Sequence, residues 1–301
     1  MRVCLPALAL LAIASIASPA SGDDADNLVG LAVVPGSDDG VVWSARNIQS
    51  FDGSRVFLPG AANVAAVTTA ADGTIFAIRG RNRFGVATPD GASIWRATPV
   101  AGRTKGLVIV ADHIAWFVQT KAEGDVKLAL TADQGRHWTV QSLPPDPDEG
   151  HLELRAGGVV ELDGYIYDCH GGDYSARYRG RIGSNSWRRT RTAAETAYHH
   201  PSHYKPLERD GPLNGADGTV RSGSIRFSVE SAYEGANGHP ARLVGLRDGE
   251  IEDRVIANHV PDGFSLITMD ARGRLLGVTK NDVWRWSQAT GWQALRARRR
   301  P

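Results

Sequence analysis

The chain contains 301 residues, of which 42% are hydrophobic, and its 34 basic side chains nearly balance 33 acidic ones. This apolar content can build a core and argues against intrinsic disorder, while the balanced charge excludes a general field that would attract nucleic acid. No stretch is long and apolar enough to cross a bilayer.

Residues 1–22 have the pattern of a secretory signal peptide. Arg2 precedes an apolar run that is too short to span a membrane, and the run ends in small residues. We expect cleavage near Ala20 or Gly22. The mature protein, residues 23–301, is then predicted to be periplasmic or secreted, with no membrane span.

Residues 23–301 consist of short β-type runs separated by tight turns rich in Asp and Gly, such as Ala71-Asp72-Gly73 and Leu162-Asp163-Gly164. These turns favour hairpins because Asp tolerates a positive φ and Gly adopts it without steric cost. A four-strand pattern recurs along the chain. The repeated units cover residues 28–60, 63–98, 106–142, 157–192, 219–257 and 264–296.

Such repetition predicts an all-β protein with a single β-propeller of six blades, each made of four antiparallel strands. Seven blades are an alternative, either because residues 28–60 hide a second sheet or because the ring closes by mixing strands from both termini. Trp95, Trp138, Trp187 and Trp292 each follow the last tight turn of a unit. We interpret these indoles as packing residues of the blades.

One segment, residues 131–138, matches the pattern Ser/Thr-x-Asp-x-Gly-x-x-Trp. It resembles the Asp box, the repeat signature of the sialidase-like (BNR-repeat) β-propellers. In this motif the carboxylate accepts backbone N–H groups, the glycine adopts the left-handed conformation and the indole packs the hairpin. The resemblance implies a structural turn between the third and fourth strands, on the face away from any active site, formed here by Thr131, Asp133, Gly135 and Trp138.

The resemblance carries over no catalytic residue, because the segment Ser54–Pro59 differs from the Arg-Ile-Pro type of segment that sialidases of this family have. In propellers the ligand face is usually formed by the loops between the second and third strands and by the links between blades. Applied to the repeated units, this rule selects candidate ligand-binding residues and the link that contains His259. The candidates are Arg79, Arg81, Arg83, His170, Asp173, Tyr174 and His239.

The segment 191–218 is longer than an ordinary connection and is rich in His and Tyr. Three interpretations stay open: a plain surface loop, a binding or acid/base site, or a metal site built from His199, His200 and His203. For acid/base chemistry the candidates are His199, His203 and Tyr204, because imidazole titrates near neutral pH and a phenol can exchange a proton. We expect no metal and no cofactor.

These observations predict an exported propeller that recognises a carbohydrate or protein ligand at its loop-rich face. A first alternative is a glycan-cleaving enzyme, either a polysaccharide lyase or a glycoside hydrolase, that uses His, Tyr and Arg residues of the funnel. A second alternative is a protein-interaction scaffold. The expected partner is a glycan or a protein outside the cytoplasm, and nucleic acid is not expected.

Overall fold

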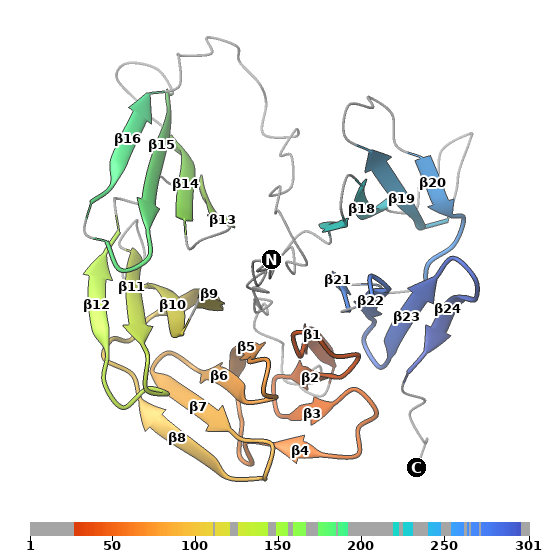
Figure 1. Ribbon diagram of the computed structural model, residues 1–301, viewed down its shortest axis with the longest axis horizontal. Helices are drawn as coiled ribbons and strands as arrows, with labels where there is room; N and C mark the ends of the chain where they lie inside the picture. Colours follow the sequence, from red (N-terminus) through yellow and green to blue (C-terminus); the bar gives the residue numbers. More distant parts are fainter. Residues whose placement is uncertain are drawn as a thin grey trace, which may run out of the picture.

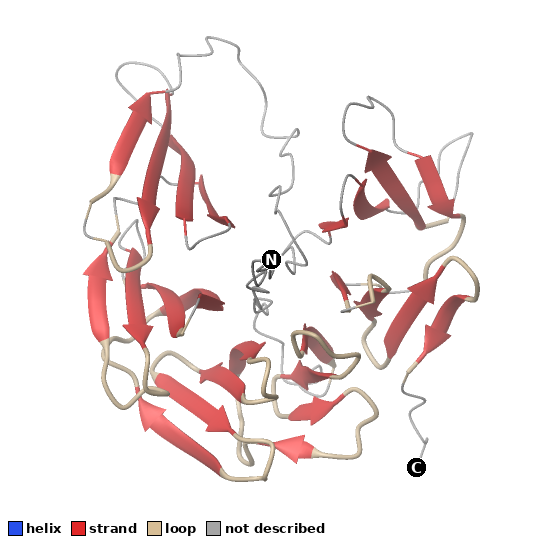
Figure 2. Cartoon of the chain, in the orientation of Figure 1, coloured by secondary structure: helices blue, strands red, loops and turns tan. Residues whose placement is uncertain are grey.

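The computed structural model describes fourteen parts of the chain, and all structural statements below concern them. These parts are residues 27–110, 112–120, 126–143, 149–155, 159–166, 174–184, 186–191, 219–222, 225–230, 240–247, 254–261, 264, 266–270 and 272–295. Their regular elements are all β-strands, and Figure 2 shows only strands and loops in its coloured segments. No helix capable of spanning a membrane occurs within them.

The described strands form six antiparallel sheets, each of four strands that are consecutive in the chain. The first sheet contains β1 (Leu28–Val33), β2 (Gly40–Ser44), β3 (Ile48–Ser50) and β4 (Val56–Phe57). The second contains β5 (Val64–Thr69), β6 (Ile75–Arg79), β7 (Arg83–Ala87) and β8 (Ser93–Ala97). The third contains β9 (Arg103–Val110), β10 (His113–Gln119), β11 (Val126–Thr131) and β12 (Thr139–Ser142).

The fourth sheet contains β13 (Glu149–Arg155), β14 (Val159–Ile166), β15 (Tyr174–Arg181) and β16 (Arg188–Arg191). The fifth contains β17 (Thr219–Ser222), β18 (Ile225–Glu230), β19 (Arg242–Arg247) and β20 (Arg254–Ala257). The sixth contains β21 (Leu266–Met269), β22 (Leu275–Val278), β23 (Val283–Ser287) and β24 (Gly291–Ala294).

The six sheets are arranged around a common centre, with first strands such as β1, β5 and β9 innermost and fourth strands such as β4, β8 and β12 outermost (Figure 1). Residues 28–57 make one sheet, so the hidden second sheet considered for this region is not found there. Among the described strands, no sheet combines strands from the two ends of the chain, so that alternative was wrong for this part of the molecule.

The fourth sheet corrects one predicted boundary. The expected turn at Leu162-Asp163-Gly164 lies inside β14, which pairs without interruption with β13 and with β15. Asp163 is directly opposite His151 on one side and Arg177 on the other. Because apolar and β-branched residues flank the Asp-Gly pair, strand pairing on both sides outweighs the local turn preference. The fourth unit therefore begins at Glu149 and not at residue 157.

Five apolar clusters hold neighbouring sheets together, and each contains residues from two adjacent sheets. Trp116 of the third sheet, for example, is fully buried against residues of the second sheet such as Phe84. The first and sixth sheets are also neighbours: Leu31 and Leu276 share a cluster, and the Leu28 N–H donates to the Lys280 carbonyl at 2.8 Å. The two ends of the described chain thus meet side by side.

The turn Thr131–Trp138 joins β11 to β12, which are the third and fourth strands of their sheet, as predicted. The Asp133 carboxylate accepts the backbone N–H of His137 at 2.9 Å, and the Thr131 hydroxyl accepts the N–H of Gly135 at 2.9 Å. The His137 imidazole also forms a hydrogen bond with the Asp133 carboxylate. The bond from the His137 N–H, followed by the bond with its side chain, holds the pKa of Asp133 well below its usual value. Gly135 has a φ of +80°, and the Trp138 indole N–H donates to the Gly135 carbonyl at 3.2 Å.

Trp138 also anchors this turn to the neighbouring sheet. Its ring meets the Phe84 ring edge-on, with centroids 5.1 Å apart and an interplanar angle of 87°. A Cβ at Gly135 would lie 2.5 Å from the Phe84 ring, so only glycine fits at this position. The motif is therefore a structural element that packs the third sheet on the second.

Candidate functional site

The order of strands divides the loops between two faces of the molecule. Because consecutive strands are antiparallel, the turns between first and second strands and between third and fourth strands share one face, the turn face. The turns between second and third strands and the links between sheets share the opposite face, the loop face. The predicted ligand-binding loops belong to the loop face, and Thr131–Trp138 belongs to the turn face.

A hollow of about 520 Å³ lies on the loop face of the sixth sheet, and we call it the loop-face hollow. The turn between β22 and β23 forms one side, and the link that follows β20 forms the other. Two indoles are part of its wall. The residues that line it are His259, Pro261, Thr279, Lys280, Asn281, Asp282, Trp284 and Trp292.

The aromatic wall of this hollow is held in place by specific contacts. The Trp292 indole N–H donates to the His259 carbonyl at 3.1 Å, which ties the ring to the link. The ring also meets Phe264 at a centroid distance of 4.8 Å and an angle of 65°. Because the indole is fixed before any ligand arrives, little rotamer entropy is lost when a ligand contacts it.

The turn on the other side is also ordered by its own hydrogen bonds. The Thr279 N–H donates to the Asp282 carbonyl at 3.0 Å, and the Thr279 hydroxyl accepts the Asp282 N–H at 3.2 Å. Within the described residues, neither the Asp282 carboxylate nor the exposed His259 imidazole has a hydrogen-bond partner. The hollow therefore combines fixed aromatic surface with polar groups that are available to a ligand.

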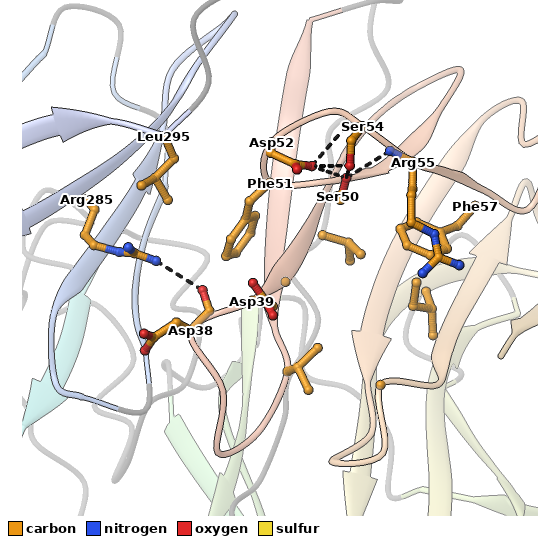
Figure 3. Close-up of a pocket in the computed structure, with 15 residues that line it drawn as sticks. Asp38, Asp39, Ser50, Phe51, Asp52, Ser54, Arg55, Phe57, Arg285 and Leu295 are labelled. Atoms are coloured by element: carbon orange, nitrogen blue, oxygen red, sulfur yellow. Dashed lines mark hydrogen bonds between the residues drawn. The ribbon is translucent and has the colours of Figure 1, made fainter. Parts of the chain in front are cut away.

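A second hollow, of about 390 Å³, lies along the seam between the first and sixth sheets, and we call it the seam hollow (Figure 3). The turn between β1 and β2 and the turn between β3 and β4, both on the turn face, border it. Arg285 and Leu295 lie on one side, Phe51, Ser50, Asp52 and Arg55 on the other, and Asp38 and Asp39 between them.

The charged groups at one end of the seam hollow are engaged with one another. Asp38 accepts Arg272 at 3.0 Å and Arg274 at 2.8 Å. Arg274 also donates through Nε to the fully buried Asp270 carboxylate at 2.7 Å. The Arg285 guanidinium donates to the Asp38 carbonyl at 3.1 Å. This network joins the turn after β1 to the sixth sheet and stabilises the contact between the first and sixth sheets.

The other end of the seam hollow carries a turn that the sequence analysis missed. The Ser50 hydroxyl donates to Asp52 at 2.6 Å and the Ser54 N–H donates to the same oxygen at 2.9 Å, which lowers the pKa of Asp52 to about 2. This turn shares the Ser/Thr-x-Asp start of the Thr131–Trp138 motif, but Gly53 directly follows Asp52 and no tryptophan stands at the motif's last position, so the full pattern does not detect it. Arg55 stacks on Phe57 at 4.9 Å and donates to the Pro89 carbonyl at 3.1 Å. Apart from Asp39, the charged residues that line the seam hollow therefore already have hydrogen-bond or ion-pair partners within the protein.

The predicted arginine loop lies on the loop face of the second sheet. Arg79 is half-buried: it donates to the Gly60 carbonyl at 2.6 Å and stacks over Trp95 at 4.7 Å. Arg81 and Arg83 are exposed, so their proposed role in binding a ligand stays a prediction. The described residues that line the loop-face hollow belong to the sixth sheet and to the link after β20, and these arginines are not among them.

The other predicted site residues lie outside what the structure describes. His170, Asp173, His199, His203, Tyr204 and His239 are not among the described residues, and neither is the cleavage region at Ala20 and Gly22. Tyr174 begins β15, but its side chain is not described. Within the described residues, no group of three or more His, Cys, Asp or Glu side chains could hold a metal ion.

Sequence reasoning missed Trp284 and the turn Thr279–Asp282 as site residues, and it assigned Trp292 to packing alone. A signal was nevertheless present. This turn connects the second and third strands of the last repeat, and the rule that selected the arginine loop concerns the same connection in the second repeat. His259 was placed on a link of the loop face, and it does line the hollow.

Neither a protein-family model nor a curated protein matches the chain. Solved structures do match. The tricorn protease has a TM-score of 0.51 at 8% identity, covering 96% of this chain and 35% of that chain. The β-propeller domain of the Trilobed protease from Pyrococcus furiosus has a TM-score of 0.43 at 11% identity, covering 91% of this chain and 86% of that one.

TolB from Acinetobacter baumannii has a TM-score of 0.39 at 12% identity, covering 93% of this chain and 62% of that chain. This chain thus spans about a third of the tricorn protease chain and less than two thirds of TolB. At such low identity the likeness concerns the fold alone. The chain is therefore an all-β protein of four-stranded antiparallel sheets whose structural neighbours are β-propeller proteins.

Proposed function

We propose that this protein is an exported, single six-bladed β-propeller of the sialidase-like, Asp-box kind, and that it recognises a carbohydrate in the loop-face hollow. The hydrogen bonds of the Thr131–Trp138 turn support the Asp-box assignment. The leader-like pattern of residues 1–22 supports export. The observation that carries the binding function is that the fixed indole of Trp292 lines one hollow together with Trp284 and the Asp282 carboxylate.

This combination suits a sugar ring. The C–H face of a sugar packs on an indole, and its hydroxyl groups need donors and acceptors placed around that ring. Asp282 accepts hydroxyl protons, and Lys280 adds an ammonium donor on the same turn. A hollow of about 520 Å³ is within the ordinary size of small-ligand sites, roughly 300–1,000 Å³.

We propose recognition without cleavage. Most glycoside hydrolases place two carboxyl groups on either side of the scissile bond. Among the described residues that line the hollow, Asp282 is the sole carboxylate. With one carboxylate among these residues, the hollow supports binding better than bond breaking by such a pair.

A glycan array of neutral and acidic oligosaccharides tests this proposal. Wild-type protein should bind a defined group of glycans, and Trp292→Ala should lose at least about tenfold in affinity, which is the effect of removing one stacked ring. Trp292→Phe keeps an aromatic ring and should retain part of the binding. Asp282→Asn should weaken binding, whereas Asp39→Asn, an exposed carboxylate in the seam hollow, is the matched control and should not.

Two results would refute the proposed function. One is a folded wild-type protein that binds no glycan on the array. The other is a loss of binding in Asp39→Asn with normal binding in Asp282→Asn, which would move the site to the seam hollow. Export is tested separately: N-terminal sequencing of protein secreted from cells should start just after Ala20 or Gly22.

A further inference from the structure

The charged residues of the first two sheets are divided between the two faces of the molecule. Within residues 27–110, which the structure describes, every acidic residue lies in a turn of the turn face. These residues are Asp38, Asp39, Asp52, Asp72 and Asp90. Basic residues gather at the opposite ends of the same strands. Those at loop-face positions are Arg46, Arg79, Arg81, Arg83 and Arg103.

Three of these basic residues form what we call the arginine group, namely Arg81, Arg83 and Arg103. The Gly102 N–H donates to the Arg81 carbonyl at 2.9 Å, so the residue before Arg103 touches the arginine loop. Arg83 is two residues from Arg81 and is directly opposite Arg79 in the β6–β7 pair. All three side chains of the group are exposed, and none of them forms a hydrogen bond or an ion pair with the described part of the chain.

The unpaired carboxylates of the turn face also lie together. What we call the acidic group consists of exposed residues, namely Asp39, Asp52, Asp72 and Asp90. Asp39 and Asp52 line the seam hollow together with Gly73, which directly follows Asp72. The Arg55 guanidinium donates to the Pro89 carbonyl at 3.1 Å, so the turn that contains Asp90 lies against the turn that contains Asp52. Asp38 is not counted, because its carboxylate is already paired with arginines of the sixth sheet.

The two groups cannot neutralise each other within one molecule. They lie at opposite ends of the same strands, and a strand of five residues such as β6 is about 17 Å long. The Debye length at physiological ionic strength is about 8 Å, so attraction across one strand is largely screened. The formal net charge of the chain is only +1, so no overall repulsion keeps two copies apart.

We propose that the arginine group of one copy docks on the acidic group of a second copy, so that the molecules associate head to tail through their first two sheets. Moving one copy along the direction from the loop face to the turn face, without rotation, places each arginine end over an acidic end. Guanidinium groups pair with carboxylates through parallel hydrogen bonds. Because the two groups lie on opposite faces, each copy contacts a neighbour on either side, and the assembly is an open stack.

A second copy fits these groups better than other occupants do. An acidic polymer would pair with the arginine group and leave the acidic group without a partner, whereas a second copy supplies partners for both. A small anion needs a cavity, and neither the loop-face hollow nor the seam hollow is lined by a member of the arginine group. Exposed ion pairs are individually weak, so the contact should be weak and sensitive to salt.

This inference does not rest on carbohydrate recognition, and its test contains no glycan. Sedimentation equilibrium of the full-length mature protein measures the average mass over a range of protein concentrations. In about 0.02 M NaCl the mass should rise above that of the monomer as concentration increases, and in about 0.5 M NaCl it should return to the monomer value because the charges are screened.

Two variants each remove one of the two surfaces. The loop variant is Arg81→Ser/Arg83→Ser, and the turn variant is Asp39→Asn/Asp72→Asn, in which asparagine keeps the acceptor oxygen that Asp72 offers to the Thr74 N–H. Each variant alone should lose about tenfold in self-association, because a stack needs both surfaces. An equal mixture should form pairs, because the intact arginine group of the turn variant meets the intact acidic group of the loop variant.

The control variant is Arg136→Ser/Arg188→Ser, which removes the same charge from exposed positions of the third and fourth sheets. It should associate as the wild type does. The melting temperatures of the loop variant and the wild type should agree, because the substituted arginines make no hydrogen bond or ion pair with the described residues.

Three outcomes would overturn the inference. In the first, wild-type protein stays monomeric at low salt at every concentration. In the second, the mixture of loop and turn variants forms no pairs although the wild type associates, which would place the contact elsewhere. In the third, the wild type stays monomeric but binds poly-glutamate and the loop variant does not, which would assign the arginine group to an acidic partner.

Discussion

The seam between the first and sixth sheets is apolar and buried, whereas the fourth sheet carries exposed arginines. At the seam, residues from the two ends of the described chain bury each other: Leu31, Val42 and Leu276 are fully buried. On the outward face of the fourth sheet, Arg179 and Arg188 are exposed although the fourth and fifth sheets follow one another in sequence.

This difference teaches that sheets distant in the sequence pack together where both present apolar side chains, as the first and sixth sheets do. Burying one large aliphatic side chain contributes about 1.5–3 kcal/mol. A face of arginines and carboxylates has no such contribution and pays desolvation when it is covered. The distant ends of the chain therefore meet through an apolar cluster, whereas Arg179 and Arg188 of the fourth sheet stay exposed.

The largest expected effect comes from weakening the seam. Leu276→Ala should lower the free energy of unfolding by about 2–5 kcal/mol, because a fully buried leucine leaves a cavity. Urea denaturation followed by fluorescence measures this. Val255→Ala, at a side chain that is 43% exposed in the fifth sheet, is the control and should change stability by less than about 1 kcal/mol. Equal losses in the two variants would contradict the comparison.

A loss of about 3 kcal/mol is expected from Asp270→Ala. The Asp270 carboxylate is fully buried and pairs with Arg274, so its removal leaves a cation without its main partner. Asp72→Ala is the matched control, because Asp72 lies in the equivalent turn of the second sheet but is exposed and accepts only the Thr74 N–H. In thermal unfolding, Asp270→Ala should have a clearly lower melting temperature than Asp72→Ala. The reverse order would contradict the role of Asp270 in joining the first and sixth sheets.

Trp138→Ala should cost about 3 kcal/mol, since this half-buried ring joins the third sheet to Phe84 of the second. Because the ring lies on the turn face, the order in which glycans bind should not change. A folded Trp138→Ala protein with a different glycan preference would contradict the assignment of the two faces.

A smaller effect with a definite pH dependence is expected at Asp133. Its pKa is lowered in the folded state, so its ionised form adds stability above the unfolded pKa, roughly 3.9, and this contribution disappears as the pH falls. The difference in melting temperature between wild type and Asp133→Asn should therefore shrink between pH 7 and about pH 3. Calorimetry that finds a constant difference would show that the carboxylate charge does not stabilise the turn.

The smallest effect is expected at Arg188, an exposed residue of the fourth sheet. Arg188→Ser removes one of two like charges that face each other, so stability should change by no more than about 0.5 kcal/mol or increase slightly. A loss as large as that of Leu276→Ala would mean that this face is packed like the seam.

The repeat and the location of the Thr131–Trp138 turn could be predicted from sequence because both depend on local signals. Turn residues such as Asp133 and Gly135 determine backbone conformation within a few positions. The same local rule failed at Asp163, where pairing with strands on both sides keeps an Asp-Gly pair extended. Strand pairing is a non-local effect that a turn pattern does not contain.

The candidate site was less predictable. His259 was found because its loop position is a property of the repeat, but Trp292 was taken as a packing residue. Only the structure shows that its ring is tied to His259 and lines a hollow together with Trp284.

Hydrogen–deuterium exchange, measured with and without a glycan that binds on the array, tests the central claim of carbohydrate recognition most directly. The account predicts slower exchange at residues 257–261 and 279–292, which surround the loop-face hollow, and this protection should be absent in Trp292→Ala. Protection confined to residues 34–55, around the seam hollow, would contradict it.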